Sequence, residues 1–168
     1  MSRQSVELDD AEIADFLASH RKVQVGTLDR HGAPHLTTLY YVVEDGCIAF
    51  WTYRSSQKVL NLRRDPRIAC LVEDGDEYFD LRGVSIRGRA SLVEDYDDVR
   101  ALGAKIVARL AGGADLGADG EAIVAAQASK RVGIIVEPVK VASWDHSKLV
   151  ALPGQASTSE DQIEGVQV

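Results

Sequence analysis

The residues with the clearest chemical potential lie in one stretch, WTYRSSQKVLNLRRDPR, at positions 51–67. Ser55 and Ser56 are good N-cap residues, and the apolar positions that follow them predict a two-turn helix that ends at Asp65. Lys58 falls in the first turn, where a cation is poorly matched to the positive end of the helix dipole. An anion between Lys58 and the free backbone N–H groups would explain this placement. The alternative is a simple helix cap with Lys58 in solvent.

Other residue patterns that carry chemistry are weak or absent in the sequence. His31 and His35 stand four apart, but a glycine and a proline between them break the helix that would bring the two rings together, so no metal site is expected. No GxSxG, HExxH or P-loop pattern supports hydrolysis. Tyr40 and Tyr41 are candidate proton donors, with strand packing as the alternative for at least one of them. The sequence therefore names no catalytic residue.

Length and composition narrow the class of protein. The chain has 168 residues, a net charge of −7, no apolar run long enough for a membrane span and no signal-peptide pattern. These features predict one soluble, cytoplasmic domain over residues 1–150 that binds neither membranes nor nucleic acid, followed by a disordered Ser/Gln/Glu tail over 151–168. A local basic patch around Lys58 suits a small anionic molecule. Cys47 and Cys70 lack CxxC spacing and are interpreted as buried, reduced thiols.

The elements that must position these residues are mainly strands. A capping-box pattern at Asp9 and Glu12 predicts an opening helix up to Ser19, and turn residues separate the strands that follow. Gly83 and Gly88 indicate bulges or close backbone approach in a long strand. The expected strands are 22–28, 35–43, 47–52, 68–72, 78–93 and 132–144, with further helices over 95–110 and up to about Lys130. This pattern predicts a mainly β, α+β fold: a six-stranded antiparallel barrel with flanking helices.

Three motifs, in their order and spacing, carry a family resemblance. They are VGTLDRHGAPHLTTLYY at 25–41, the 51–67 stretch, and YFDLRGVSIRGRASLVED at 78–95. Together they resemble the split β-barrel flavin and deazaflavin oxidoreductases that are related to pyridoxamine 5'-phosphate oxidase. The resemblance covers residues 13–149. It implies a split barrel, and it implies a homodimer with the cofactor site at the subunit interface.

The resemblance also implies two groups of cofactor-binding residues. In the family, the segment that leads into the helix grips the cofactor phosphate, which points here to Thr52, Ser55, Ser56 and Lys58, with Asn61 as a neighbouring candidate. The strand after the Gly-x-Pro turn lies along the tricyclic ring, mostly through backbone groups. This second set is His35, Thr37, Thr38 and Leu39, for which ordinary strand pairing is the alternative, above all at the two threonines.

Departures from the family pattern bear on the cofactor and the reaction. Pyridoxamine phosphate oxidases use an arginine on the ring-binding strand and an Arg/His-bearing C-terminal segment, whereas this chain has Thr37 and ends its last strand in VASWDHSKL, which argues against vitamin B6 oxidation. The NLRRDPR run favours the deazaflavin coenzyme F-420 over FMN, although phosphate capture by Lys58 suits both. The expected function is hydride transfer between the bound cofactor and a small organic substrate. The alternative is a flavin or haem carrier without turnover.

Overall fold

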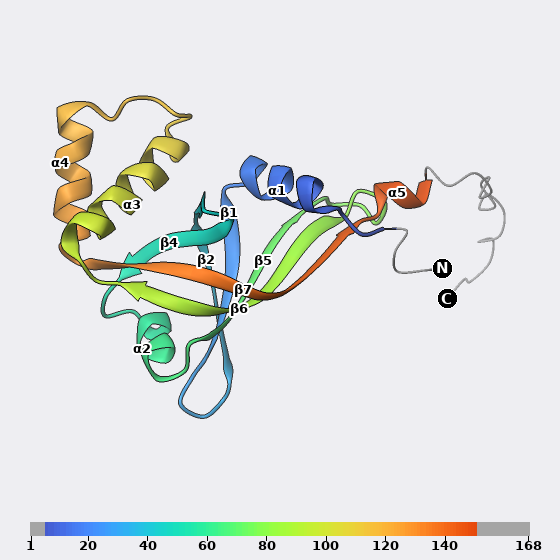
Figure 1. Cartoon of the computed structure of the whole chain (residues 1–168), viewed down its shortest axis with the longest axis horizontal. Helices are drawn as coiled ribbons and strands as arrows, with labels where there is room; N and C mark the ends of the chain where they lie inside the picture. The colour runs from blue at the N-terminus through green and yellow to red at the C-terminus, as the bar shows by residue number, and fades with distance from the viewer. Residues whose placement is uncertain (1–5, 151–168) are drawn as a thin grey trace, which may run out of the picture.

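The computed structural model describes residues 6–150, so the predicted tail at 151–168 lies outside the described residues. The described part contains five helices and seven strands (Figure 1). In chain order they are α1 (Asp10–Ser19), β1 (Lys22–Leu28), β2 (Pro34–Tyr40), β3 (Val42–Glu44), β4 (Cys47–Tyr53), α2 (Gln57–Arg64), β5 (Arg67–Asp74), β6 (Arg82–Val93), α3 (Tyr96–Leu110), α4 (Gly117–Ala128), β7 (Arg131–Asp145) and α5 (Ser147–Val150).

All seven strands form one antiparallel sheet in the order β2-β1-β5-β6-β7-β4-β3. Helices α3 and α4 stand together at one end of the sheet, and α2 lies beside the tip of the β1–β2 hairpin (Figure 1). The predicted mainly β split-barrel fold with flanking helices is therefore confirmed. The opening helix also begins as predicted, because Asp9 and Glu12 form a complete capping box.

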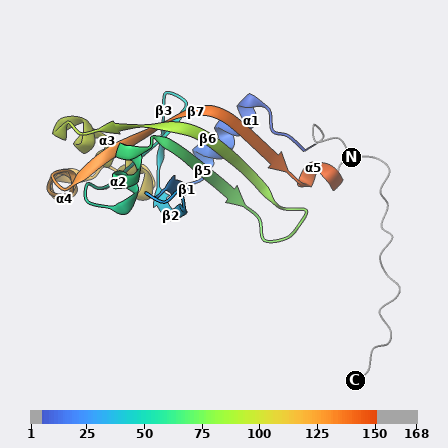
Figure 2. The ribbon, with the colours of Figure 1, turned by 90° about the horizontal axis from the view of Figure 1, so that it is seen from below.

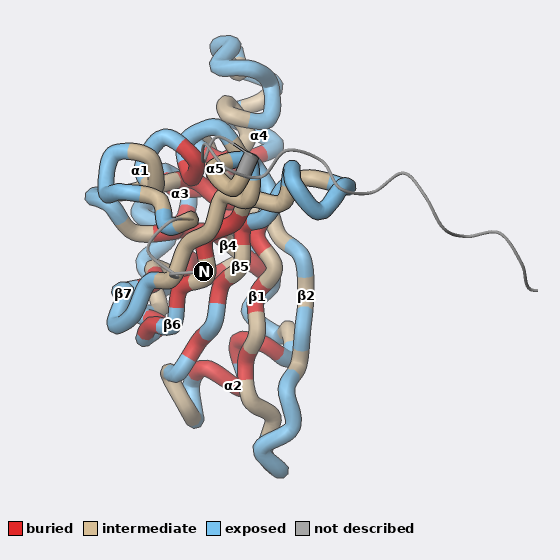
Figure 3. Tube along the Cα trace, turned by 90° about the vertical axis from the view of Figure 1, so that its right-hand side faces the viewer, coloured by how far each residue is buried: buried red, intermediate tan, exposed pale blue. Residues whose placement is uncertain are grey.

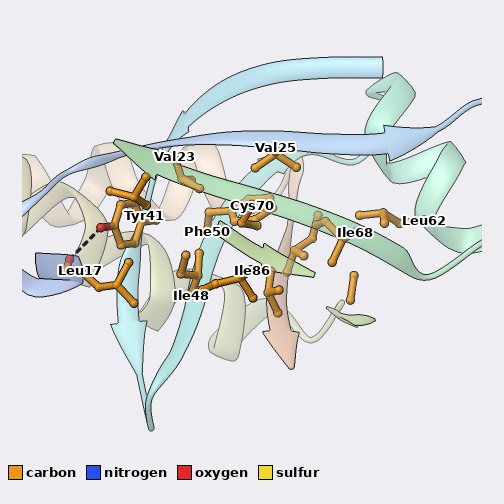
Figure 4. Packing of buried hydrophobic residues seen from close by; sticks show 14 of the residues in the cluster. Leu17, Val23, Val25, Tyr41, Ile48, Phe50, Leu62, Ile68, Cys70 and Ile86 are labelled. Atoms are coloured by element: carbon orange, nitrogen blue, oxygen red, sulfur yellow. Dashed lines mark hydrogen bonds between the residues drawn. The ribbon is translucent and has the colours of Figure 1, made fainter. Parts of the chain in front are cut away.

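The predicted second strand, 35–43, is wrong as a single strand, because it divides at Tyr41. β2 pairs with β1 and β3 pairs with β4, so the two pieces are the opposite edges of the sheet. Since one residue separates these edges along the chain, the sheet must curl until both edges meet at Tyr41. The Tyr41 ring is 1% exposed, and its hydroxyl donates a 2.7 Å hydrogen bond to the Leu17 carbonyl (Figure 4). The sheet therefore has seven strands.

The predicted strand 78–93 is too long at its start. β6 begins at Arg82, and the preceding residues form a turn in which the Asp80 amide donates to the Glu77 carbonyl. Gly75 has a φ of +99°, and a Cβ there would lie 2.3 Å from the Asp80 oxygen, so this turn requires glycine. The bulge inferred from Gly88 is present, between Arg87 and Gly88. Helix α5 is an element that the sequence did not predict.

The main core fills the concave side of the curled sheet. Alternate residues of β1 and β4, among them Val23, Val25 and Phe50, point into it and are fully buried (Figure 4). Cys70 is buried there as predicted, and burial raises the pKa of its thiol to about 12. The predicted burial of Cys47 is wrong, because that thiol is half-buried, although both cysteines are free.

Replacement of Tyr41 by phenylalanine tests the junction between the two edges. We expect a loss of about 1 kcal/mol of unfolding free energy at pH 7, because Arg109 still donates to the Leu17 carbonyl. Burial raises the pKa of the Tyr41 hydroxyl from 10.0 to about 12, against the opposing effect of the Arg109 guanidinium. The folded state thus holds this proton more tightly, and the resulting stability is complete below pH 10 and is lost as pH rises toward 12.

Urea unfolding of Tyr41→Phe and of the parent at pH 7 and at several values above pH 10 measures both effects. The difference in unfolding free energy between Tyr41→Phe and the parent should become smaller as the pH rises. The adjacent, exposed Tyr40 provides the matched control, Tyr40→Phe, which we expect to unfold like the parent. A gap that stays constant across this range would contradict the role of the buried hydroxyl.

Candidate functional site

Helix α2 begins where strand β4 leaves the core. The Ser56 amide donates to the Tyr53 carbonyl in a tight turn, and the helix then presents one buried face to the sheet. Lys58 and Asn61 lie on that face one turn apart, together with apolar residues that join the core. The Val59 amide donates to the Ser56 carbonyl, so the free amides at the start of α2 are those of Gln57 and Lys58. Free amides at a helix N-terminus are suited to an anion.

Asn61 fixes α2 against β1. Its side chain is 0% exposed, and its amide nitrogen donates a 3.0 Å hydrogen bond to the Thr27 hydroxyl. Its side-chain oxygen, Oδ1, accepts a 2.9 Å hydrogen bond from the side-chain amide of Gln57. Both ends of the Asn61 side chain are thus engaged by the protein. This predicted cofactor-binding residue therefore acts as a clamp: its hydrogen bond to Thr27 holds α2 against β1 and so sets the position of the helix N-terminus.

Ser56 occupies the N-cap position, but its side chain makes no capping hydrogen bond, so the predicted serine cap is wrong in this respect. Its Oγ atom is buried and has no hydrogen-bond partner. A buried hydroxyl without a partner is costly, and native proteins rarely leave one in this state without a functional reason. Ser55, the other predicted cap residue, is exposed. The Ser56 hydroxyl is therefore a polar group that the described structure leaves without a partner.

Lys58 is not in solvent, so that part of the alternative is wrong, whereas the anion site stays a prediction. Its side chain is 8% exposed, and its ammonium donates a 3.2 Å hydrogen bond to the Thr52 hydroxyl, while no carboxylate pairs with it among residues 6–150. Burial lowers the pKa of Lys58. Burial of the Lys58 charge is unfavourable, and so is its position at the positive end of the helix dipole. A bound anion would offset both of these costs.

The predicted ring-binding strand divides into two faces. Exposed and half-buried residues alternate along β2 (Figure 3). The half-buried residues His35, Thr37 and Leu39 pair with the buried residues of β1 that face the core and α2, whereas Thr38 is exposed on the opposite face. The His35 Nδ1 atom and the Thr37 Oγ1 atom are buried without a hydrogen-bond partner in the described structure. Two of the four predicted residues therefore present unused polar atoms on the same side of the sheet as Lys58, and Thr38 does not.

A cavity of about 640 Å³ lies between the tip of the β1–β2 hairpin and α2. His35 lines it from the hairpin, and Gln57 and Leu60 line it from the helix. The remaining lining residues are Asp29, Arg30, His31, Pro34 and Arg64. Of these lining residues, sequence reasoning proposed only His35 and, through the NLRRDPR run, Arg64 as part of the site. The sequence indicates a turn at 29–32 and basic residues on α2. It does not indicate that they lie close together, because this depends on the hydrogen bond between Thr27 and Asn61.

The cations of the NLRRDPR run are less available than the sequence predicts. Arg63 pairs with Glu94, and Arg67 forms a bidentate pair with Asp65, whose pKa it lowers to about 2. Arg64 lines the cavity and donates to the Leu28 carbonyl. Only one arginine of this run therefore faces the candidate site.

Neither predicted proton donor lies in the cavity. Tyr41 is committed to the Leu17 carbonyl, and Tyr40 is exposed on the face of β2 opposite His35. Within residues 6–150, His, Cys, Asp and Glu side chains form no group of three or more that could hold a metal ion. No helix in the same range is long and apolar enough to span a membrane.

The family model of pyridoxamine 5'-phosphate oxidase matches residues 9–145, which span α1 to the end of β7. The chain belongs to this family. The match contains both the α2 segment and strand β2, so the candidate site lies wholly inside the region that defines the family. No curated protein matches the chain.

Three solved structures illustrate the range of the fold. The conserved hypothetical protein Rv2991 from Mycobacterium tuberculosis is 39% identical, with 95% of this chain and 98% of that chain covered and a TM-score of 0.83. An F-420 reductase is 22% identical, with 76% and 93% covered and a TM-score of 0.58. The haem storage protein HutZ from Vibrio cholerae is 16% identical, with 79% and 92% covered and a TM-score of 0.62. The last two share the fold alone.

Asn61→Ala tests whether Asn61 is a clamp. We expect it to lower the unfolding free energy by about 2 kcal/mol, because the buried Thr27 hydroxyl loses its partner. The matched variant Gln57→Ala removes the exposed partner of Asn61 and should change stability by less than about 0.5 kcal/mol. A double-mutant cycle of Asn61→Ala with Thr27→Val measures the coupling between helix and strand. An Asn61→Ala protein as stable as the parent would show that Asn61 does not hold α2.

Proposed function

We propose that this protein is an oxidoreductase that transfers a hydride between a bound deazaflavin, coenzyme F-420, or FMN and a small organic substrate, with F-420 the favoured cofactor. The observation that carries the proposal is the set of unused polar groups around α2 and β2. Among the described residues, Lys58 is a buried cation without a carboxylate partner, and Ser56, His35 and Thr37 each hold a buried polar atom without a hydrogen-bond partner. These groups fit a ligand that has a phosphate at one end and a polar ring at the other.

Each set of residues has a separate part in this proposal. Lys58, with the hydroxyls of Thr52, Ser55 and Ser56 and the amides of the first turn of α2, would hold the phosphate. His35, Thr37 and Leu39 would face the ring, and the Asn61 clamp would set the distance between the two ends. The cofactor supplies the hydride chemistry when it is bound, so the protein needs to bind and orient it against the substrate.

Two features favour F-420 over FMN within this proposal. Arg30 and Arg64 line the cavity, where they would meet the acidic tail of the deazaflavin cofactor. The F-420 reductase that shares the fold agrees with this choice. Membership of the pyridoxamine 5'-phosphate oxidase family keeps FMN as the alternative. The proposal retains the homodimer, with the cofactor at the subunit interface, as expected from the family resemblance.

Paired titrations and a steady-state assay test the proposal. We expect reduced F-420 to bind more tightly than FMN and to be oxidised only when an organic acceptor is added. Tight binding of F-420, FMN or haem without turnover across a panel of acceptors would support the carrier function instead. A clearly lower dissociation constant for FMN would reverse the cofactor preference.

Lys58→Met tests the phosphate anchor, because methionine keeps the buried apolar stem and removes the charge. The loss of a charge-assisted contact worth about 1.5 to 3 kcal/mol should weaken cofactor binding by about 10- to 150-fold. Because burial lowers the pKa of Lys58, the charged ammonium is a cost to the empty fold, so the apo protein should be as stable as the parent or slightly more stable.

Lys22→Met is the matched control, since Lys22 is exposed at the start of β1, at the other end of the hairpin from its turn. Cofactor affinity and urea unfolding should be measured on the same preparation of each variant. A Lys58→Met protein that binds the cofactor as well as the parent would show that Lys58 is not the anchor, and so would a loss of binding that merely follows unfolding of the apo protein.

A further inference from the structure

The outer face of the sheet, on the side away from the main core, is basic where it approaches α2. Arg87 lies directly opposite Lys140, and Arg67 lies directly opposite Arg89, so the side chains of each pair point to the same side of the sheet. Arg67 is neutralised by Asp65. The other three cations form no ion pair within residues 6–150, and together they are called the basic end: Arg87, Arg89 and Lys140.

The loop between β5 and β6 carries the opposite charge. Residues 73–80 hold five carboxylates and no lysine or arginine. Asp74 pairs with Arg82. The three carboxylates of the loop that form no ion pair with a described residue are Asp76, Glu77 and Asp80. This loop is called the acidic tip.

Two aromatic side chains project from the acidic tip. Tyr78 is 61% exposed and Phe79 is 54% exposed, and their rings meet edge to face. Tyr78 also lies against the ring of His146, which donates a hydrogen bond to the Tyr78 carbonyl and so anchors the tip to the end of β7. Phe79 has no second ring contact among the described residues. Two large apolar side chains that are held together in solvent and rimmed by charges are typical of a protein–protein contact.

Between the basic end and the acidic tip, the outer face is uncharged. Leu71, Ser85 and Ala142 form one row across β5, β6 and β7, and Gln24 continues this row on β1. The Gln24 Oε1 atom is buried and has no hydrogen-bond partner in the described structure. Because native proteins rarely leave a buried oxygen in this state, the middle of the face is also suited to a further polar contact.

The order of charges along the outer face favours one kind of contact between two copies of the chain. Figures 1 and 2 show α2 toward one end of the molecule and the loop between β5 and β6 toward the other end, beside α5. A two-fold axis along the uncharged row, across the strands, reverses the strand direction and brings each basic end onto the acidic tip of the other copy. An axis parallel to the strands would instead place the cations of both copies together.

The basic end lies next to the cofactor cavity. All three of its cations line a groove on the outer face, and this groove shares Pro34 with the cavity. The described residues that line the cavity include no phenylalanine, tyrosine or tryptophan, and the Leu60 side chain among them is 48% exposed. An acidic tip on the basic end would therefore bring aromatic side chains to the rim of the cavity.

We propose that the acidic tip of the partner subunit lies on the basic end and that the partner's Phe79 forms an outer wall of the cofactor cavity. This inference rests on the proposed function and adds a residue that acts across the subunit interface. The carboxylates of the tip pair with the basic end, which leaves Arg30 and Arg64 to the ligand. Tyr78 of the partner subunit supports the Phe79 ring from the side.

Mixed dimers test whether Phe79 acts across the interface. Lys58→Met removes the phosphate anchor from its own subunit, whereas Phe79→Ser removes the wall from the site of the other subunit. We expect each of these homodimers to bind the cofactor at least about 10-fold more weakly than the parent. A dimer of one Lys58→Met subunit and one Phe79→Ser subunit, purified through two different affinity tags, keeps one undamaged site. It should bind the cofactor with the affinity of the parent at half the parent's stoichiometry.

The opposite result is equally clear. If Phe79 acts within its own subunit, both sites of the mixed dimer are damaged, and no site of parental affinity appears. That outcome, with a parent that binds the cofactor, would overturn the inference and leave the proposed function standing. A parent that binds neither F-420 nor FMN would overturn the proposed function, and the role of Phe79 with it.

Two controls separate this role from a structural one. Urea unfolding of Phe79→Ser should match that of the parent, because the ring is exposed, and earlier unfolding would show that the ring serves its own loop and would overturn the inference. Tyr96→Ser removes an aromatic ring that is 46% exposed on α3 and should leave cofactor binding unchanged.

A charge exchange tests the contact between the acidic tip and the basic end without any cofactor. Asp76→Lys with Glu77→Lys should weaken the dimer by about 10-fold or more in sedimentation at low salt. Addition of Arg87→Glu and Lys140→Glu to the same chain should restore the dimer, because the charges are then exchanged on both sides. A dimer that the first pair leaves unchanged, or that the second pair weakens further, would show that the tip lies elsewhere and would overturn the inference.

Discussion

The meeting of the two sheet edges at Tyr41 is the constraint on which the rest of the structure depends. β2 and β3 lie at opposite ends of the strand order, yet only Tyr41 separates them along the chain, so the sheet must curl. The buried hydroxyl of Tyr41 then ties this junction to the end of α1. Curling gives the sheet an inner side, which the main core fills, and an outer side that faces away from this core.

Within this frame, a polar contact positions the candidate site. Apolar burial alone would let α2 slide or rotate on the sheet, because hydrophobic contacts are not directional. The fully buried hydrogen bond from Asn61 to Thr27 removes that freedom and sets the first turn of α2 opposite the hairpin that carries His35. Polar groups that the described structure leaves without a charged or hydrogen-bonding partner, above all Lys58 and Ser56, are thereby held at the start of α2, next to Gln57, which lines the cavity. Such groups destabilise the protein in the absence of a ligand, and this is the physical reason for interpreting the region as a binding site.

Local patterns in the sequence predicted much of this arrangement. The capping box at Asp9 and the passage from strand to helix before Lys58 are encoded within a few residues. The pattern of strands and turns predicted the barrel, and the family motifs added that the barrel is split. Three features depend on contacts between distant residues and were beyond local reasoning. Tyr41 ends β2 because the residues on its two sides pair with different strands. Asn61 points inward because it donates a hydrogen bond to Thr27 on β1, and Arg63 is taken up in an ion pair with Glu94.

The central claim is that one ligand spans the first turn of α2 and the inner face of β2. Amide chemical-shift changes during a titration with reduced F-420 test this most directly. The account predicts that the amides of Ser56, Gln57 and Lys58 and those of His35 and Thr37 shift together and saturate at one dissociation constant. Two different saturation curves for the helix and the strand, or shifts confined to the outer face around Leu36 and Arg87, would contradict it.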